Sequence, residues 1–412
     1  MTKRWKLRLV SVVFSLVAAI LISEIGMRVA GISSPNFMMP DQYRGFSLRP
    51  GMEGWWRKEG EAYIRINSDG LRDRERTKEK PANTFRIAVL GDSMMEGLQV
   101  PLEQTACAIM EQRLKECGIL SDQKVEVINF GVSSYGTAQE LLTLRHKVWN
   151  YSPDLVLLAV TTSNDIKDNS PALAQDPDLR AYFTYKDGQL VPDMSFSQSA
   201  RFQRQQSLLG RSLFWLKDHS RIVQVVNDVR SALRARREAK DKKIVDAYNF
   251  VYREPGDQVW NEAWRVTEGT ILLMRDEVEQ KGAKFMVATL SNDWQDHPDP
   301  SVRQEFARSL GVADLFYPDQ RIKTLGEREG FAVVNLAPAF REYCERTKVY
   351  LHGFGPQIGF GHWNAEGNRL AGEALAKALC EIIEKQPSRT PASLSRSDEL
   401  PKSAGRVGVV RP

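Results

Sequence analysis

Five short apolar runs, each alternating with a helical pattern, place the strongest limit on what this chain can fold into. The runs lie at residues 85–90, 125–130, 155–161, 285–290 and 331–336. The helical patterns lie at residues 105–117, 138–149, 261–281, 318–329 and 365–384. Runs that are apolar on both faces are typical of strands in a parallel sheet. The alternation therefore predicts an α/β fold, a three-layer α/β/α sandwich with helices on both faces of a parallel sheet.

The stretch between the third and fourth runs departs from this alternation. It has no strand signal of comparable quality, and residues 208–243 carry apolar side chains spaced by threes and fours with basic residues between them. The apolar positions are Leu213, Leu216, Val223, Val226, Val229 and Leu233. We expect a helical insertion at about residues 170–260, acting as a lid over the crevice, a membrane-surface helix or a solvated arm.

The N-terminus predicts a membrane segment. Four cations in the first eight residues precede residues 9–22, which are apolar apart from two serines, and this layout is typical of a segment oriented positive-inside. Glu24 and Arg28 lie at i, i+4, so one helix could carry both near the interface and span residues 5–30. We expect an anchor over residues 1–32, with a cleaved signal peptide or a buried helix as alternatives, and the rest of the chain on the extracytoplasmic side.

The net charge of +5 is unevenly distributed. Residues 198–243 hold 12 Lys or Arg against 4 Asp or Glu, and the N-terminus and the segment 386–412 are also basic, so the remainder is acidic. This distribution argues against a nucleic-acid partner. Residues 33–84, rich in Gly, Pro and aromatic side chains with a turn signal at 68–70, predict a strap or short hairpin leading into a core at 85–385. The composition of residues 386–412 predicts a disordered tail.

The four cysteines have no spacing typical of a zinc site or of a nucleophile signature. If Cys107 and Cys117 lie on one helix they are about 15 Å apart, which is too far for a disulfide. A bridge between Cys344 and Cys380 stays open, and buried thiols are the simpler interpretation. His297, between an Asp and a Pro, is a poor metal site by itself, and we expect no metal and no cofactor.

A serine follows the first predicted strand directly. Residues 85–90 run into Gly91-Asp92-Ser93, which places the Ser93 hydroxyl beyond the carboxyl end of a strand. Open α/β sheets have their ligand crevice at that edge. A lone serine there would more often cap the next helix.

Four segments resemble the motifs of the SGNH, or GDSL, hydrolase family. They are Gly91-Asp92-Ser93-Met94, residues 129–133 (Asn-Phe-Gly-Val-Ser), residues 162–165 (Thr-Ser-Asn-Asp) and residues 361–367, which begin Gly-His-Trp-Asn. Their order and strand-end placement match the family from about residue 85 to 384, apart from the insertion. Residues 66–72 also resemble a segment that precedes the first motif in many membrane-anchored members. The resemblance implies a flavodoxin-like sheet and an esterase site.

The resemblance assigns a role to each motif. Ser93 is implied as the nucleophile and His362 as its base, because a serine hydroxyl is a weak nucleophile until a neighbouring group takes its proton. The implied oxyanion donors are the Ser93 N–H, the Gly131 N–H and the Asn164 side-chain amide, and losing one such donor typically costs about 10²- to 10³-fold in rate.

One position departs from the family pattern. An Asp usually lies three residues before the His, but this chain has Gly359 there. Three explanations stay open: a backbone carbonyl holds His362, a carboxylate from elsewhere takes over, or the site is weak or inactive. Asp293 and Asp296 are the candidate acids because their loop also leaves the carboxyl end of a strand, and His352 is a candidate for the pocket mouth.

Three functions follow from these residues. The first is hydrolysis of O-acyl esters, with O-acetyl groups on an envelope glycan or a small ester as the expected substrate. The second is acyl transfer through the same acyl-serine. The third is a catalytically silent protein that binds envelope glycans or assists their assembly, which the missing Asp favours.

Overall fold

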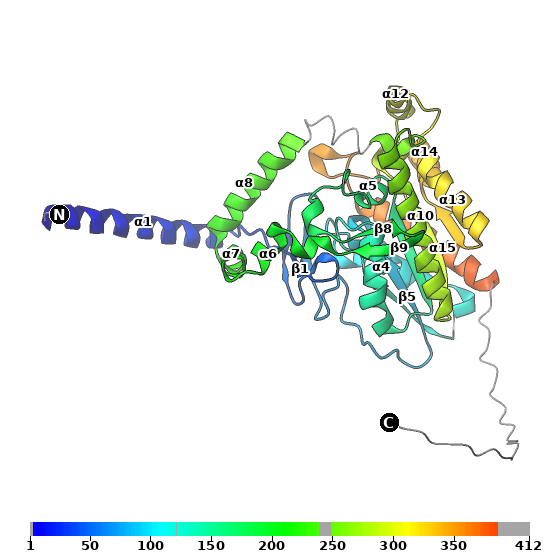
Figure 1. Cartoon of the computed structure of the whole chain (residues 1–412), viewed down its shortest axis with the longest axis horizontal. Helices are drawn as coiled ribbons and strands as arrows, with labels where there is room; N and C mark the ends of the chain where they lie inside the picture. Colours follow the sequence, from blue (N-terminus) through cyan, green and yellow to red (C-terminus); the bar gives the residue numbers. More distant parts are fainter. Residues whose placement is uncertain (1–2, 121, 239–248, 386–412) are drawn as a thin grey trace, which may run out of the picture.

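A five-stranded parallel sheet forms the centre of the molecule in the computed structural model, which describes residues 3–120, 122–238 and 249–385 (Figure 1). The strand order is β11-β10-β7-β5-β6, and every neighbouring pair is parallel. The bounds are β5 (Thr84–Leu90), β6 (Lys124–Asn129), β7 (Leu155–Thr161), β10 (Lys284–Leu290) and β11 (Ala332–Asn335). Each strand begins and ends within one residue of its predicted run, so the predicted α/β fold is confirmed.

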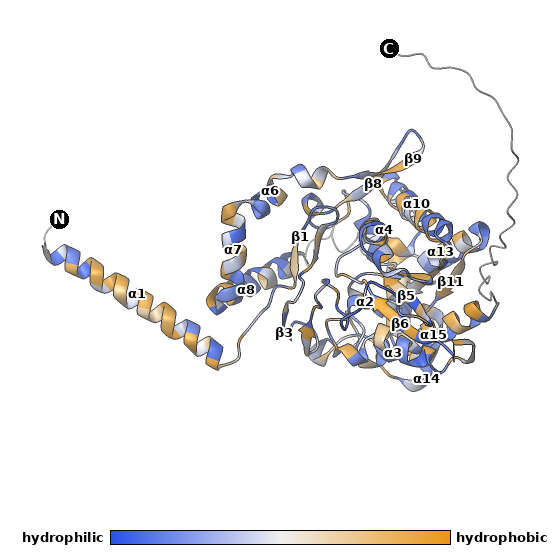
Figure 2. Cartoon of the chain, turned by 90° about the horizontal axis from the view of Figure 1, so that it is seen from below, coloured by the Kyte–Doolittle hydropathy of each residue, from blue (hydrophilic) through white to orange (hydrophobic). Residues whose placement is uncertain are grey.

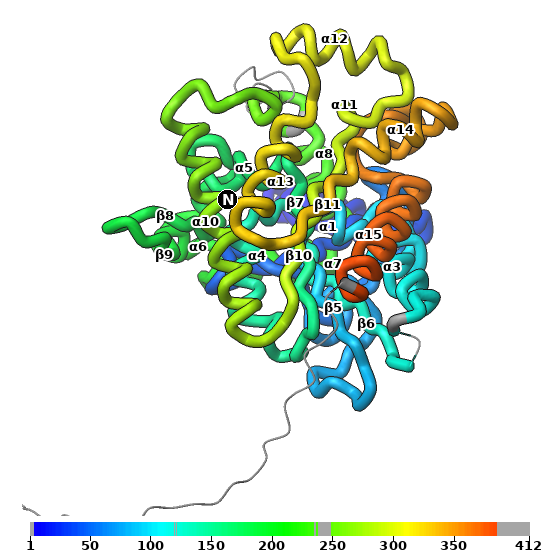
Figure 3. The backbone as a smooth tube through the Cα atoms, turned by 90° about the vertical axis from the view of Figure 1, so that its right-hand side faces the viewer, coloured from blue at the N-terminus to red at the C-terminus, as the bar shows by residue number. Residues whose placement is uncertain are grey.

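Helices cover both faces of the sheet (Figure 3). One face packs against α4 (Thr137–His146), α10 (Gln258–Gln280) and α13 (Tyr317–Glu329). The other packs against α3 (Ala106–Leu114), α14 (Ala337–Thr347) and α15 (Ala365–Lys385). Along β5, Ala88 and Leu90 enter the first core while Ile87 and Val89 enter the second. This period of two is what a strand buried on both faces requires.

The chain order of the strands reverses at β5. The chain runs from β5 to β6 on one side and then returns to β7 on the other. In open α/β sheets such a switch point opens a crevice beyond the carboxyl ends of the strands. Short elements follow the strands there or connect the layers: α2 (Ser93–Glu96), η1 (Leu102–Gln104), η2 (Gly118–Leu120), η3 (Val148–Tyr151), α5 (Asp165–Asp168), α11 (Asp293–Asp296), α12 (Pro300–Leu310) and η7 (Gly355–Gln357).

The strap, residues 33–84, forms two antiparallel hairpins. They are β1 (Met38–Asp41) with β2 (Gly45–Leu48), and β3 (Glu53–Trp56) with β4 (Ala62–Arg65). Strap residues such as Leu48 and Ile64 are buried in a small core of their own, together with Leu98 and Tyr135 of the main domain. The strap is therefore packed onto the sheet domain along its length.

The segment between β7 and β10 contains the predicted helices and, in addition, a short hairpin that the sequence did not indicate. Its elements are η4 (Pro177–Leu179), β8 (Tyr182–Lys186), β9 (Gln189–Asp193), η5 (Ser195–Gln198), α6 (Ala200–Gln206), α7 (Leu208–His219), α8 (Arg221–Glu238) and η6 (Phe250–Tyr252). The periodic stretch at 208–243 is broken after His219, where Ser220 ends α7. Residues 239–243 of that stretch lie outside the described residues.

The N-terminal helix α1 (Lys3–Val29) projects from the body and is apolar along most of its length (Figure 2). Residues Arg4–Val29 form one helix of 26 residues that is long and apolar enough to cross a membrane, and it is unburied. A membrane anchor and a signal sequence both fit this finding. The segment 386–412, predicted to be disordered, lies outside the described residues.

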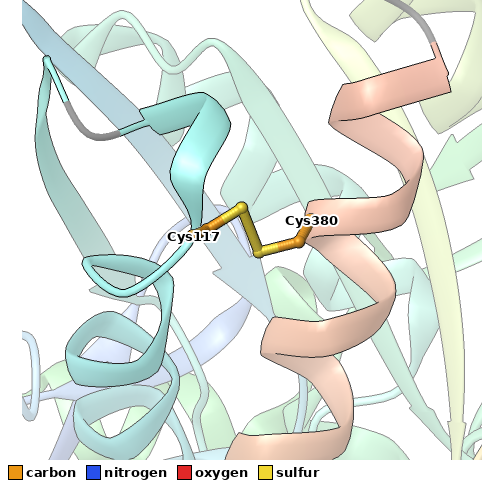
Figure 4. Close-up of a disulfide and its surroundings, with 2 residues drawn as sticks. All are labelled: Cys117 and Cys380. Carbon is orange, nitrogen blue, oxygen red and sulfur yellow. A yellow bond between two sulfur atoms is a disulfide. The ribbon is translucent and has the colours of Figure 1, made fainter.

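A disulfide joins Cys117 to Cys380 (Figure 4). The two Cα atoms are 6.1 Å apart, and the bridge ties the loop after α3 to α15. The bridge that we considered between Cys344 and Cys380 is not formed, because Cys344 is buried and unpaired, as is Cys107. Since α3 ends at Leu114, Cys107 and Cys117 do not share a helix.

Candidate active site

Ser93 lies at the start of α2, directly after β5. The side chain of Asp92 accepts a hydrogen bond from the Met94 N–H at 3.0 Å and so caps the short helix. Asp92 also accepts from the Thr161 hydroxyl at 2.8 Å and from the Asn164 amide at 3.0 Å. This one carboxylate therefore links the first motif to the third across the switch point.

The structure brings Ser93 and His362 together although 269 residues separate them. The distance from Nε2 of His362 to Oγ of Ser93 is 2.9 Å. His362 lies in the loop before α15, and this loop is paired with the chain at His352 through an isolated bridge to Trp363. The geometry is that of a hydroxyl and a base within proton-transfer reach.

The carboxylate at the other side of the imidazole is Glu59, from the strap. The distance from Oε2 of Glu59 to Nδ1 of His362 is 2.5 Å, and Oε1 accepts the His362 backbone N–H at 2.7 Å. Neither a backbone carbonyl nor Asp293 nor Asp296 occupies this place. The expectation for the orienting group is therefore corrected, and Ser93, His362 and Glu59 form a continuous chain of hydrogen bonds.

Glu59 reaches the imidazole because it lies at the tip of the β3–β4 hairpin. The Trp56 indole N–H donates to the Glu59 carbonyl at 2.9 Å and closes the turn. Gly60 follows with φ +69°, and a Cβ there would lie 2.3 Å from the carbonyl oxygen of Gln99. Only glycine combines this left-handed backbone with so close an approach, and the tip therefore packs directly onto the loop after α2.

The structure also explains why this loop has a glycine, Gly359, at the position where the family usually has an Asp. Its φ is +96°, and a Cβ would lie 2.9 Å from the Tyr350 ring. An aspartate at this position would be strained in its backbone and would clash with that ring. The loop thus excludes the acid at its usual position, while the strap brings another one from the opposite side.

Asp293 and Asp296 hold the loop that carries His362 without contacting the His362 ring. Asp293 accepts the Gly361 N–H at 2.9 Å, and Asp296 lies 3.2 Å from Nε2 of His352. The other ring nitrogen of His352 lies 2.7 Å from the Gly361 carbonyl oxygen. Both nitrogens of this buried ring thus face acceptors, which requires both to be protonated. Burial lowers the pKa of His352, but the contact with Asp296 outweighs burial and raises this pKa to about 9.

Neither His297 nor His352 lines the cavity, so the structure does not place His352 at the pocket mouth where we considered it. His297 is buried, and its ring packs near Tyr350 and Phe360. His352 is buried behind the loop instead of lying at the mouth of the pocket. Among the described residues, no three His, Cys, Asp or Glu side chains are grouped as a metal site would require.

Only two of the three residues predicted to donate to the oxyanion line the cavity. Ser93 and Asn164 line the cavity, and the Asn164 amide uses one of its two hydrogens on Asp92. Gly131 does not line the cavity, and its N–H donates to the Asn129 side chain at 2.9 Å. The structure thus corrects the placement of the Gly131 N–H, which is directed away from the reaction centre.

Ser134, three residues further along the same loop, lines the cavity instead. It has φ +66°, a left-handed conformation that is uncommon for a residue other than glycine. Among the described residues no acceptor is bonded to its N–H. Ser133, its neighbour, is held by Glu96 on α2, which accepts the Ser133 N–H at 2.6 Å. The sequence gives little signal for Ser134, because only the backbone conformation distinguishes it.

The charges of the site favour an ion pair between base and acid. Burial lowers the pKa of His362, but the hydrogen bond and the charge of Glu59 outweigh burial and raise the pKa above its usual value. Burial raises the pKa of Glu59, but the contacts with His362 outweigh it and lower that pKa. Each partner thus stabilises the charged form of the other.

A cavity of about 1210 Å³ opens over Ser93. Its floor is formed by the strand ends, with Ser93, Asn164 and His362 among them. Its walls come from β1 and β2 of the strap and from α6, α7 and α8 of the insertion. The insertion thus closes one side of the cavity, and it supplies three cations that are free of ion pairs within the described part of the chain: Arg204, Lys217 and Arg230.

Comparisons with known proteins give the following similarities. No family model matches the chain. An arylesterase of Vibrio mimicus is 31% identical over 86 residues, which are 21% of this chain and 41% of the relative. The chain thus covers about two fifths of the length of this curated relative.

Two solved structures illustrate the structural similarities. A lipolytic protein of the G-D-S-L family from Desulfitobacterium hafniense DCB-2 has 12% identity and a TM-score of 0.34, over 71% of this chain and 98% of that one. An acetylxylan esterase from Geobacillus stearothermophilus has 12% identity and a TM-score of 0.35, over 71% and 93%.

Proposed function

We propose that this chain is a serine esterase of the SGNH type, which hydrolyses O-acyl esters through an acyl-serine intermediate. The observation that carries the proposal is the chain of hydrogen bonds from Oγ of Ser93 to His362 at 2.9 Å and from His362 to Glu59 at 2.5 Å. The similarity to an arylesterase supports hydrolysis of esters as the reaction class.

The geometry gives each group a role. Nε2 of His362 takes the proton of Ser93 while Oγ attacks the ester carbonyl, and Glu59 stabilises the imidazolium that forms. The backbone N–H groups of Ser93 and Ser134, together with the Asn164 amide, supply donors for the oxyanion. His362 then protonates the leaving alcohol. In the second half of the reaction it activates a water that hydrolyses the acyl-serine.

We propose an acylated glycan of the cell envelope as the substrate, with O-acetyl as the acyl group. A cavity of about 1210 Å³ is much larger than a small ester requires, and its walls offer cationic and polar side chains to a hydroxylated chain. A cavity of this size also has room for an acceptor sugar beside the acyl-serine, so acyl transfer is the second candidate function.

We propose that α1 stays attached as a membrane anchor and that the catalytic domain lies on the extracytoplasmic side. The four cations of the first eight residues favour a cytoplasmic N-terminus. The disulfide between Cys117 and Cys380 supports the same side, because disulfides persist in oxidising compartments and are rare in the cytosol.

The proposal is tested with the full chain in detergent and a fluorophosphonate probe. We expect rapid labelling that is lost in Ser93→Ala and strongly slowed in His362→Ala. Labelling of the unaltered protein no faster than that of Ser93→Ala would overturn the enzyme proposal in favour of a silent glycan-binding protein. The absence of an Asp before His362 had favoured such a protein, but Glu59 lies at the imidazole in place of that Asp.

A second measurement separates hydrolysis from transfer. The protein is incubated with acetylated envelope glycan, and free acetate is compared with acetyl moved to an added oligosaccharide. We expect acetate to be the main product, and acetyl on the oligosaccharide in its place would favour a transferase.

A further inference from the structure

The end of α1 is held to the junction of α7 and α8 by polar contacts. Glu24 accepts hydrogen bonds from the backbone N–H groups of Arg221 and Ile222, at 2.9 and 3.2 Å, and from the Ser220 hydroxyl at 3.1 Å. Its carboxylate thus caps the N-terminus of α8. Arg28, which also pairs with Glu24 at 2.9 Å, donates to the carbonyl of the last α7 residue, His219.

These contacts give the two charged residues of α1 a role in the structure. The sequence places Glu24 and Arg28 at the end of an apolar helix, where an unpaired charge would be costly. Here both face the insertion, and the α7–α8 junction is therefore fixed at the end of α1 nearest the body (Figure 1). If α1 spans a bilayer, α7 lies at the bilayer surface.

The two faces of α7 have different surroundings. Gly210, Leu213, Phe214 and Lys217 line the cavity. Leu208, Leu209, Trp215 and Leu216 are absent from the cavity and have exposed fractions of 82%, 67%, 60% and 40%. An apolar face so open to solvent is unusual for a soluble domain and typical of a surface that meets a partner.

The helix α8 also exposes apolar side chains on one face. Val226, Val229 and Leu233 have exposed fractions of 44%, 54% and 51%, while Val223, Asn227 and Arg230 of the same helix line the cavity. The segment that contains both helices is basic, since residues 198–238 carry nine Lys or Arg against three Asp or Glu. A tryptophan with leucines on one face and cations around them is the composition of a helix that lies in a membrane interface.

We propose that α7 lies in the plane of the membrane and inserts Leu208, Leu209 and Trp215 into the boundary between headgroups and acyl chains of a bilayer that contains anionic lipid. The junction with α1 holds the helix at that depth, and the cations meet the anionic headgroups. Because the opposite face of α7 forms a wall of the cavity, the cavity is held next to the membrane surface. This proposal does not depend on the esterase activity; it depends on α1 remaining attached.

The test uses the full chain in lipid nanodiscs of phosphatidylethanolamine and phosphatidylglycerol. A nitroxide spin label is placed at Leu208→Cys, or in the matched variant at Lys217→Cys. These positions are nine residues apart and thus on opposite faces of the helix. The native thiols do not compete for the label, because Cys107 and Cys344 are buried and the other two are bridged.

The accessibility of each label to oxygen is compared with its accessibility to a water-soluble nickel complex. We expect the oxygen-to-nickel ratio to be several-fold higher at position 208 than at position 217, because oxygen concentrates in the lipid. Labels at Leu209→Cys and Trp215→Cys repeat the measurement if Leu208→Cys does not fold, as judged by circular dichroism.

Two results would overturn the proposal. Equal ratios on the two faces would mean that α7 does not enter the lipid. A ratio that falls to the value in water when each nanodisc holds one chain would mean that a second copy, not lipid, covers this face.

Discussion

The strap and the insertion both lie outside the repeating α/β pattern, yet they relate to the site in different ways. The strap is buried against the domain, with Ile64 fully buried, and it delivers Glu59 to the imidazole of His362. The helices α7 and α8 of the insertion expose apolar side chains, with Leu233 half exposed, and they contribute cavity walls without contacting Ser93 or His362 through a hydrogen bond. The strap thus belongs to the chemistry and the insertion to the surroundings of the substrate.

This difference shows that the distance of a segment along the chain from the four motifs does not decide whether that segment contributes to the site. A side chain can hold a reacting group within a few tenths of an ångström only if its own segment is fixed by packing. The β3–β4 hairpin meets that condition through its buried residues and through Gly60. The helices α7 and α8 do not, since they expose most of their apolar side chains, and they suit binding of a variable substrate or of a membrane.

The largest expected effect is that of Glu59→Gln. The variant removes the charge that stabilises the imidazolium, and the corresponding change in a serine protease costs about 10⁴-fold in kcat. We therefore expect a loss of about 10³- to 10⁴-fold in kcat/KM on an acetyl ester. Glu61→Gln, an exposed position two residues further on, is the control and should be close to unaltered.

The pH profile of the same variant provides an independent readout. Burial lowers the pKa of His362 and Glu59 raises it, so removing the Glu59 charge should lower that pKa. Since the base acts in its neutral form, the acidic limb of kcat/KM should move to lower pH. If Asp296→Ala lost more activity than Glu59→Gln, the acid would come from the loop after β10 and not from the strap.

The second prediction compares the packing of the two regions. Ile64→Ala in the strap deletes a fully buried side chain and should lower the free energy of unfolding by about 2–5 kcal/mol. Leu233→Ala in the insertion removes a half-exposed side chain and should change it by less than about 0.5 kcal/mol. Urea unfolding followed by tryptophan fluorescence measures both, and equal losses would contradict the distinction between the regions.

The third prediction concerns the support of the histidine loop. Asp293→Ala removes the acceptor of the Gly361 N–H, which precedes His362, and should lower kcat by about 10- to 100-fold through misplacement of the imidazole. KM should change less than kcat, because the carboxylate holds the loop that carries His362, although Asp293 also borders the cavity. The control is Asp299→Ala, which removes the N-terminal cap of α12 and lies six residues after Asp293 in the chain. A change in KM alone would instead make Asp293 a binding residue.

The smallest expected effect comes from the insertion. Lys217→Gln removes a cation from the cavity wall and should raise KM for an anionic acetylated oligosaccharide by about two- to fivefold, since an exposed ion pair is worth up to about 1 kcal/mol. Neither kcat nor the KM for a neutral ester should change. Arg211→Gln on the same helix does not line the cavity and serves as the control. A fall in kcat would place the insertion closer to the chemistry than the comparison allows.

The sheet could be predicted closely because its signal is local. Each strand is a continuous apolar run with a helix after it, and parallel strands have their carboxyl ends at one edge. That rule is also why Ser93 after β5 and Asn164 after β7 could be expected to meet. That the Gly131 N–H bonds to Asn129 could not be predicted, because the direction of an N–H in a loop depends on backbone angles that the residue types do not fix.

The sequence by itself determined the layers and the edge of the sheet at which the site lies, because these depend on periodicity and on residues next to strands. The pairing of Ser93 with His362 was implied by the resemblance of the motifs, since His362 follows no strand directly. Only the tertiary structure decided the rest: that Glu59 holds the imidazole, that Cys117 pairs with Cys380, and that α1 is fixed to the insertion. Each of these contacts joins segments whose separation along the chain carries no periodic signal. They depend on which surfaces pack together. Gly60 lets the β3–β4 hairpin approach the loop after α2 closely enough for Glu59 to enter the site, while the position of Gly359 has no room for an acid.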